Sequence, residues 1–178
     1  MKKRILIPLF CLLTLSIHTQ ETPKETKDYS DNVKTLDSII NTLYTVISGE
    51  KGQERNWTLF KHLFKADAKL IAAGKDNKGV YKARYMSPND YIKSSEKWLV
   101  NNGFFEKEIH RKVDAFGTIA QVFSTYEAFK SETDETPFMR GINSIQLFYD
   151  GQRWWIVNLY WTQETQEQPI PNMYLSKQ

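Results

Sequence analysis

The sequence predicts an α+β fold in which a curved antiparallel sheet wraps over three N-terminal helices. Two observations support this class. Apolar residues recur at helical spacing in segments before residue 103, and from residue 104 they alternate along the chain as in strands. Helices therefore come first and strands afterwards, so parallel βαβ units are not expected. The length of 178 residues suits one domain.

The first predicted helix covers residues 31–47. Asp31 can cap its start, and Ser48 and Gly49 end it. Its apolar face repeats at every third or fourth position, as expected for a helix that packs on a core. The members of this face are Val33, Leu36, Ile40, Leu43 and Ile47.

Two shorter helices are predicted after it. One begins at Asn56 and carries an aromatic stripe that favours core packing over a cofactor site. The other begins at Ser87 and Pro88, which suit the cap and the first helical position, and ends at Gly103. The aromatic stripe consists of Trp57, Phe60, Leu63 and Phe64.

Four strands are predicted near residues 104–115, 119–130, 138–149 and 154–163, joined by hairpin turns. The domain is expected to span 31–163. Residues 164–178 then form a C-terminal tail with two prolines.

The N-terminal segment indicates export. Lys2, Lys3 and Arg4 precede a short apolar run, which is typical of a signal peptide over residues 1–20. The run is too short for a spanning helix, so no integral membrane segment is expected after cleavage, although a retained anchor stays an alternative. Residues 21–30 are polar and predict a flexible tether. The expected location is periplasmic or secreted.

Charge and cysteine content exclude several functions. The chain has 24 Lys and Arg against 21 Asp and Glu. Three of the basic residues lie in the predicted signal peptide, so the mature chain has 21 of each and a formal charge of zero. Nucleic acid is therefore not an expected partner. Cys11, the single cysteine, is also in that segment, which excludes disulfides and cysteine nucleophiles from the mature chain.

Two segments resemble a known superfamily. The stretch from Trp57 to Ala68 contains Phe60-x-x-Leu63-Phe64-x-x-Asp67-Ala68, and residues 151–157 read Gly-Gln-Arg-Trp-Trp-Ile-Val. Both are similar to structural motifs of nuclear transport factor 2-like and SnoaL-like proteins, and the likeness covers nearly all of residues 31–163. The resemblance implies a cone-shaped fold with a pocket between sheet and helices, common dimerisation, and either binding or isomerase, dehydratase or cyclase activity. It supplies no matching catalytic residue.

Strand alternation predicts which polar residues face such a pocket. On the face taken as inward, an apolar floor is followed by a polar rim. Arg111 and Glu127 are either an anion or carbonyl clamp with a general base, or a structural salt bridge. The other candidates could orient a polar ligand group or make ordinary hydrogen bonds at a sheet rim. They are Asn143, Asn158 and Tyr160.

Other motifs point to no cofactor and no metal. His62 and His110 could transfer protons, but neither has a motif around it, and a surface or satisfied imidazole is favoured over a catalyst for His62, which lies between Phe60 and Phe64 on a helix. Glu106, Glu108 and His110 alternate on one strand and could converge on a metal, but a solvated outer face is favoured because no further ligand motif is present. No glycine pattern for phosphate or dinucleotide binding is present.

The favoured interpretation is an exported domain that binds a small apolar or partly polar ligand. The alternatives are an enzyme of the isomerase, dehydratase or cyclase type acting on a carbonyl compound, and an interaction module. A carboxylate or imidazole in the cavity beside a second polar group would favour the enzyme. A homodimer through the sheet is also expected, on an apolar strip that the C-terminal tail could cover instead. The strip consists of Trp155, Val157, Leu159 and Trp161.

Overall fold

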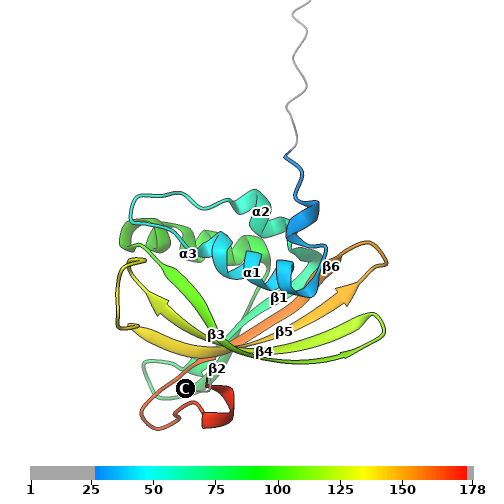
Figure 1. Ribbon diagram of the computed structural model, residues 1–178. Coiled ribbons are helices and arrows are strands. Elements are labelled where there is room, and N and C mark those ends of the chain that lie inside the picture. Colours follow the sequence, from blue (N-terminus) through cyan, green and yellow to red (C-terminus); the bar gives the residue numbers. More distant parts are fainter. Residues whose placement is uncertain (1–26, 176–178) are drawn as a thin grey trace, which may run out of the picture.

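Three helices lie across one face of a curved six-stranded sheet (Figure 1). The computed structural model describes residues 27–175, so the predicted signal peptide and most of the predicted tether lie outside the described residues. The predicted α+β class is confirmed. Within the described range, no helix is long and apolar enough to cross a membrane.

The helices begin at side-chain caps. The α-helices are α1 (Leu36–Ile47), α2 (Trp57–His62) and α3 (Pro88–Asn102), and two short 3-10 turns are η1 (Ser30–Asn32) and η2 (Asn172–Tyr174). Helix α1 begins later than predicted because Thr35, and not Asp31, caps it. Thr35 Oγ1 accepts a hydrogen bond from Ser38 N at 3.0 Å, and Ser38 Oγ accepts one from Thr35 N at 3.0 Å.

The two later helices begin where their caps predict. Asn56 Oδ1 accepts from Leu59 N at 3.0 Å at the start of α2. Ser87 forms a capping box with Asp90 at the start of α3, and Gly103 ends that helix with a positive φ of 71°.

The sheet has the order β2-β1-β6-β5-β4-β3. Its strands are β1 (Phe64–Lys75), β2 (Tyr81–Met86), β3 (Phe105–Phe116), β4 (Ile119–Phe129), β5 (Met139–Tyr149) and β6 (Trp154–Gln163). The last four match the predicted strands closely. Strands β1 and β6 are parallel, and all other neighbours are antiparallel, so the sheet is not wholly antiparallel as predicted.

Strands β1 and β2 were not predicted because their sequences have weak strand character. Strand β1 is rich in alanine and lysine, which are depleted in strands. It is held by its position between β6 and β2, where Leu70 is fully buried. Asp76 shapes the connecting turn, since its Oδ1 accepts from Lys78 N at 2.9 Å and from Val80 N at 3.0 Å.

Two bulges change the alternation of the sheet. In β3, Glu108 pairs with Tyr126 and His110 with Thr125, so Ile109 is an extra residue. In β6, Ile156 pairs with Leu147 and Asn158 with Gln146, so Val157 is an extra residue. Beyond each bulge the side chains exchange faces.

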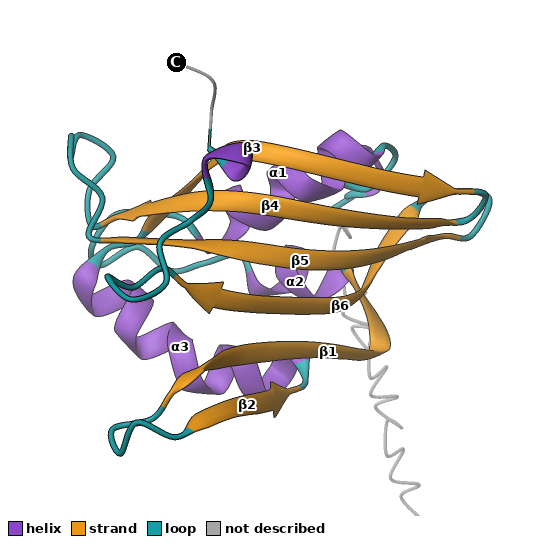
Figure 2. Cartoon of the chain, turned by 90° about the horizontal axis from the view of Figure 1, so that it is seen from below, coloured by secondary structure: helices purple, strands orange, loops and turns teal. Residues whose placement is uncertain are grey.

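We call the helix side of the sheet the inner face and the opposite side the outer face. Figure 2 shows the outer face in front, with the helices behind it. The core lies between the inner face and the helices, and includes Ile39, Ile40, Phe60, Leu63 and Val122. Most of the predicted aromatic stripe is therefore core, as Phe60, Leu63 and Phe64 are buried.

Arg55 holds the loop between α1 and α2 in place. Its side chain is buried, and its Nε donates to Ile47 O at 2.8 Å. Its Nη2 donates to Gly49 O at 2.6 Å and to Leu99 O at 3.3 Å. These bonds join the end of α1 to α3, and burial lowers the pKa of Arg55.

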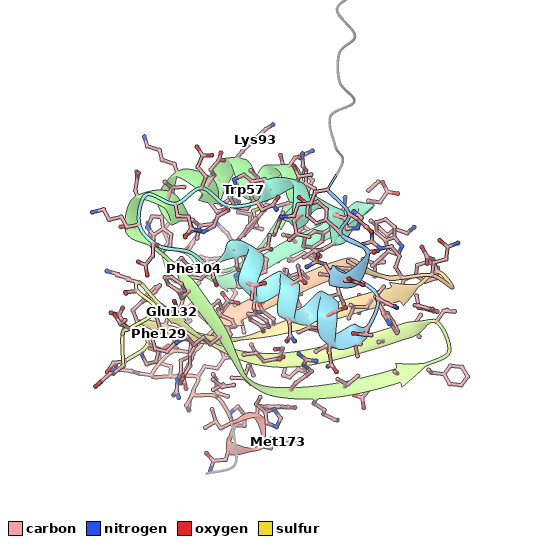
Figure 3. All side chains as sticks on the ribbon, turned by 45° about the horizontal axis from the view of Figure 1, so that its top comes forward. Trp57, Lys93, Phe104, Phe129, Glu132 and Met173 are labelled. Carbon is pink, nitrogen blue, oxygen red and sulfur yellow. The ribbon has the colours of Figure 1, made fainter. Side chains whose placement is uncertain are left out.

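The C-terminal segment 164–175 crosses the outer face (Figure 2). Thr125 Oγ1 donates to Tyr174 O at 2.6 Å, and the ring of Tyr174 packs edge-on against Phe123 at 5.0 Å. Met173 accordingly lies on the side of the sheet away from the helices (Figure 3). These contacts are with β3 and β4, whereas the alternative to a dimer placed the tail over the apolar strip on β6.

Candidate functional site

A cavity of about 170 Å³ lies between the helices and the inner face. Its walls are mainly aromatic and aliphatic side chains from α1, α2, α3 and five strands. Phe104, beside the start of β3, lies between the helix layer and the sheet (Figure 3). The polar side chains that reach the cavity are Tyr91, Ser95, Glu106, Tyr126, Asn143 and Gln163.

Among residues 27–175, Glu106 is the one charged residue that lines this cavity. Asn143 Nδ2 donates to Glu106 Oε1 at 3.1 Å. Burial raises the pKa of Glu106 to about 7, and the hydrogen bond from Asn143 opposes part of that rise. In the part of the chain that the structure describes, no cation forms a salt bridge with Glu106.

Three tyrosines surround the carboxyl group of Glu106. Burial, followed by the negative charge of Glu106, raises the pKa of Tyr44, Tyr91 and Tyr126. Their phenols are therefore neutral and can donate hydrogen bonds. A Cβ at Gly141 would lie 2.5 Å from the Tyr126 hydroxyl, so this glycine makes room for the phenol.

The aromatic rings pack against one another around the cavity. Tyr91 stacks on Phe60 at 5.3 Å between ring centroids and meets Trp161 edge-on at 6.3 Å. Trp98 and Phe104 make a further edge-on pair at 6.0 Å. These contacts give the cavity rigid apolar walls around one polar end.

This arrangement suits proton transfer. A carboxyl group that titrates near neutral pH can accept or donate a proton under ordinary conditions. Neutral phenols and an amide beside it can stabilise charge that develops on a bound molecule. The carboxylate beside a second polar group is the feature that was expected to favour an enzyme.

Of the predicted site residues, Asn143 lines the cavity. Arg111 lies on the inner face but outside the cavity, where Nη1 pairs with Asp37 Oδ1 at 2.6 Å. Its Nε also donates to Glu108 Oε1 at 2.9 Å. Arg111 therefore forms no pair with Glu127.

Glu127, Asn158 and Tyr160 lie on the outer face, away from the cavity. In β4 the predicted alternation turned Glu127 inward. In the structure the neighbouring Tyr126 faces the cavity instead, so Glu127 points to the outer face. Asn158 and Tyr160 are outside because the bulge at Val157 reverses the rest of β6. Glu127 instead lies 3.9 Å from Arg140 Nη1.

The reversal in β6 also changes the strip proposed for dimerisation. Leu159 and Trp161 line the cavity. Trp155 lies near the β5–β6 turn, where its Nε1 donates to Asp150 at 2.6 Å and Arg153 stacks on its ring at 3.6 Å. The four residues therefore do not form one surface.

The two histidines lie outside the cavity, and Glu106, Glu108 and His110 do not converge on one face. His62 Nε2 lies 2.6 Å from Arg153 Nη1. Glu106 and Glu108 precede the bulge at Ile109 and face inward. His110 follows the bulge and faces outward, where it packs against Tyr174. Among the described residues, no group of three His, Cys, Asp or Glu could hold a metal ion.

Sequence reasoning missed Glu106, Tyr91 and Tyr126 as site residues. One signal was available, because Phe104 and Glu106 share a face in an alternating strand. A buried phenylalanine two residues before a carboxylate indicates that the carboxylate also points inward.

No family model and no curated protein matches this sequence. Solved structures do match its fold. A nuclear transport factor 2-like protein of unknown function from Silicibacter pomeroyi has a TM-score of 0.51 and 15% identity, over 72% of this chain and 92% of that one. A protein of unknown function with a cystatin-like fold from Nostoc punctiforme has a TM-score of 0.55 and 8% identity, over 73% and 89%.

A third match is a protein named as the beta subunit of an aromatic-ring-hydroxylating dioxygenase from Novosphingobium aromaticivorans. Its TM-score is 0.56 at 11% identity, over 80% of this chain and 94% of that one. At such identities the matches establish the fold and leave the activity open. Together with the helices and the curved sheet, they show that the chain has the nuclear transport factor 2-like fold.

Proposed function

We propose that this chain binds a small, largely apolar molecule in the cavity and that Glu106 transfers a proton to or from it. The observation that carries the proposal is the carboxyl group of Glu106, held by Asn143 at 3.1 Å at the polar end of an aromatic cavity. Burial places the pKa of Glu106 at about 7, where a carboxyl group is useful as both acid and base.

The cavity limits the ligand. A volume of about 170 Å³ suits a molecule smaller than a typical drug. Its apolar body would contact the rings of Phe60 and Trp161. One polar group would lie at Glu106 and the nearby phenols, because a polar group elsewhere would lose its hydrogen bonds to water.

The reaction class follows from the groups that are present. Ionised Glu106 would take a proton from a carbon next to a carbonyl group, leaving an enolate. The phenols of Tyr91 and Tyr126 would donate to the enolate oxygen. Neutral Glu106 would then return the proton to another carbon, which completes an isomerisation, or to a leaving hydroxyl group, which completes a dehydration.

Binding without chemistry is the second candidate function. The apolar walls support it, since they are sufficient to hold a hydrophobic molecule whatever Glu106 does. Export to the periplasm or medium, which the N-terminal sequence predicts, would give either function access to compounds outside the cytoplasm. Cell fractionation with N-terminal sequencing near residue 20 would check the location.

Mass spectrometry of molecules retained by the purified protein would identify the ligand. With that ligand in D₂O, the wild type should exchange carbon-bound hydrogen for deuterium. Glu106→Gln should still bind the ligand but lose exchange by at least about a hundredfold. Glu127→Gln, on the outer face, is the matched control and should exchange like the wild type. Equal exchange in Glu106→Gln would exclude the proton-transfer function and leave binding.

A further inference from the structure

We infer that a chain of hydrogen bonds from the surface pair Asp37–Arg111 fixes the orientation of the Asn143 amide, so that Ser124 and Tyr44 act as positioning residues for Glu106. The inference deepens the proposed function, because it explains how the carboxyl group of Glu106 is kept ready for proton transfer. Its own evidence is the geometry of the inner face.

The chain connects four elements. Asn143 Nδ2 on β5 lies 3.1 Å from Glu106 Oε1 and 3.2 Å from the Tyr44 hydroxyl on α1. The Tyr44 hydroxyl lies 2.6 Å from Ser124 Oγ on β4. Ser124 Oγ in turn donates to Glu108 Oε1 on β3. Ser124 is fully buried and Asn143 nearly so.

The proton positions in this chain follow from its charged end. Arg111 Nε lies 2.9 and 3.0 Å from the two oxygens of Glu108, and Arg111 also pairs with the exposed Asp37. A carboxylate paired in this way only accepts hydrogen bonds. Ser124 must therefore donate to Glu108.

The remaining bonds then have a single arrangement. Since the Ser124 hydrogen is used, Tyr44 must donate to Ser124. The Tyr44 oxygen is left as an acceptor, and the amide nitrogen of Asn143 satisfies it. The same nitrogen thereby donates to Glu106. The opposite amide orientation would place two acceptor oxygens together.

Few other groups act on Glu106. The titratable groups that face it are the phenols of Tyr44 on α1, Tyr91 on α3 and Tyr126 on β4, and Glu108 follows it on the same strand. Within residues 27–175, the Asn143 amide is the hydrogen-bond donor recorded for Glu106. Turning this amide should therefore change how readily Glu106 loses its proton.

The test is a titration of Glu106 by NMR, with glutamate labelled with ¹³C at the side-chain carboxyl group. The Glu106 signal is assigned as the one that Glu106→Gln removes. In Ser124→Ala, Tyr44 loses its acceptor and can donate to the Asn143 oxygen, which turns the amide. The pKa of Glu106 should then rise by about 1 or more above the wild-type value, because the charged form loses its donor.

Two further variants complete the experiment. Ser144→Ala removes a neighbouring serine on the outer face and should leave the titration of Glu106 unchanged. Tyr44→Phe removes the hydroxyl that orients the amide, and should raise the pKa of Glu106 in the same direction even if Ser124→Ala does not fold. A wild-type titration of Glu106 in a folded Ser124→Ala or Tyr44→Phe would overturn the inference. No ligand is needed, so a rise in these variants without deuterium exchange in the wild type would refute the proposed function alone.

Discussion

Replacing Glu106 with glutamine should stabilise the protein at neutral and alkaline pH. Burial raises the pKa of Glu106 from 4.5 to about 7, so the folded state holds this proton more tightly than the unfolded state. The contribution of Glu106 to stability is therefore greatest below pH 4.5 and falls as the pH rises to about 7. Glutamine is neutral at every pH and can still accept the hydrogen bond from Asn143.

The magnitude follows from the linkage between proton binding and folding. At about 1.4 kcal/mol per pKa unit, the shift from 4.5 to about 7 makes full ionisation of Glu106 cost at most about 3.5 kcal/mol, of which roughly 2 to 3 kcal/mol falls between about pH 5 and about pH 8. The free energy of unfolding of Glu106→Gln should therefore gain this amount relative to wild type between about pH 5 and about pH 8. Urea denaturation of both proteins at the two pH values measures it.

A control is available in the same chain. Glu132 lies exposed in the β4–β5 connection, at the edge of the fold (Figure 3), and Glu132→Gln should follow the wild-type pH dependence. If the wild type and Glu106→Gln lose stability in parallel over this range, the carboxyl group is not desolvated. The reasoning about the site would then be refuted.

Three further predictions concern other parts of the fold. Burial, followed by the charge of Arg153, lowers the pKa of His62, so stability should fall as the pH drops below about 6.5, and His62→Gln should reduce that loss in acid denaturation. Arg55→Met should lower the free energy of unfolding by about 2 to 4 kcal/mol in urea, because four carbonyl groups, those of Ile47, Gly49, Gln53 and Leu99, lose a donor. The homodimer stays a prediction, now based on the exposed outer-face row that includes Tyr85 and Tyr160. Light scattering should give twice the monomer mass, reduced by Tyr85→Lys, and a monomeric wild type at micromolar concentration would contradict it.

The parts of the fold that were predictable have local signals. Asn56 and Ser87 cap their helices as the sequence indicated, because each side chain satisfies amides within its own first turn. Strands β3 to β6 alternate clearly enough to be placed within a residue or two. Strand β1 lacks such a signal, and its pairing with β6 depends on residues far along the chain.

The candidate site was less predictable because side-chain direction depends on register. Asn143 lines the cavity, because β5 follows a regular alternation. The predicted alternation of β4 was shifted by one residue and therefore placed Glu127 on the inner face. A shift of one residue moves every side chain of a strand to the opposite face. No sequence pattern marked the true start of that alternation.

The bulges explain why the site departs from the sequence pattern. Glu108 and Arg111 are three residues apart, so in a regular strand they would point to opposite faces. The extra residue Ile109 brings both to the inner face, where Arg111 pairs with Glu108 and the Glu108 carboxylate also accepts the hydrogen bond from Ser124.

The bulge at Val157 shapes the apolar wall of the cavity, because it turns the side chains of Leu159 and Trp161 to the inner face. Bulges commonly redirect side chains next to functional sites. The aromatic wall of this cavity, and the Glu108–Arg111 pair on the inner face outside it, thus depend on an interrupted alternation. A prediction that assumes regular strands fails at these residues for that physical reason.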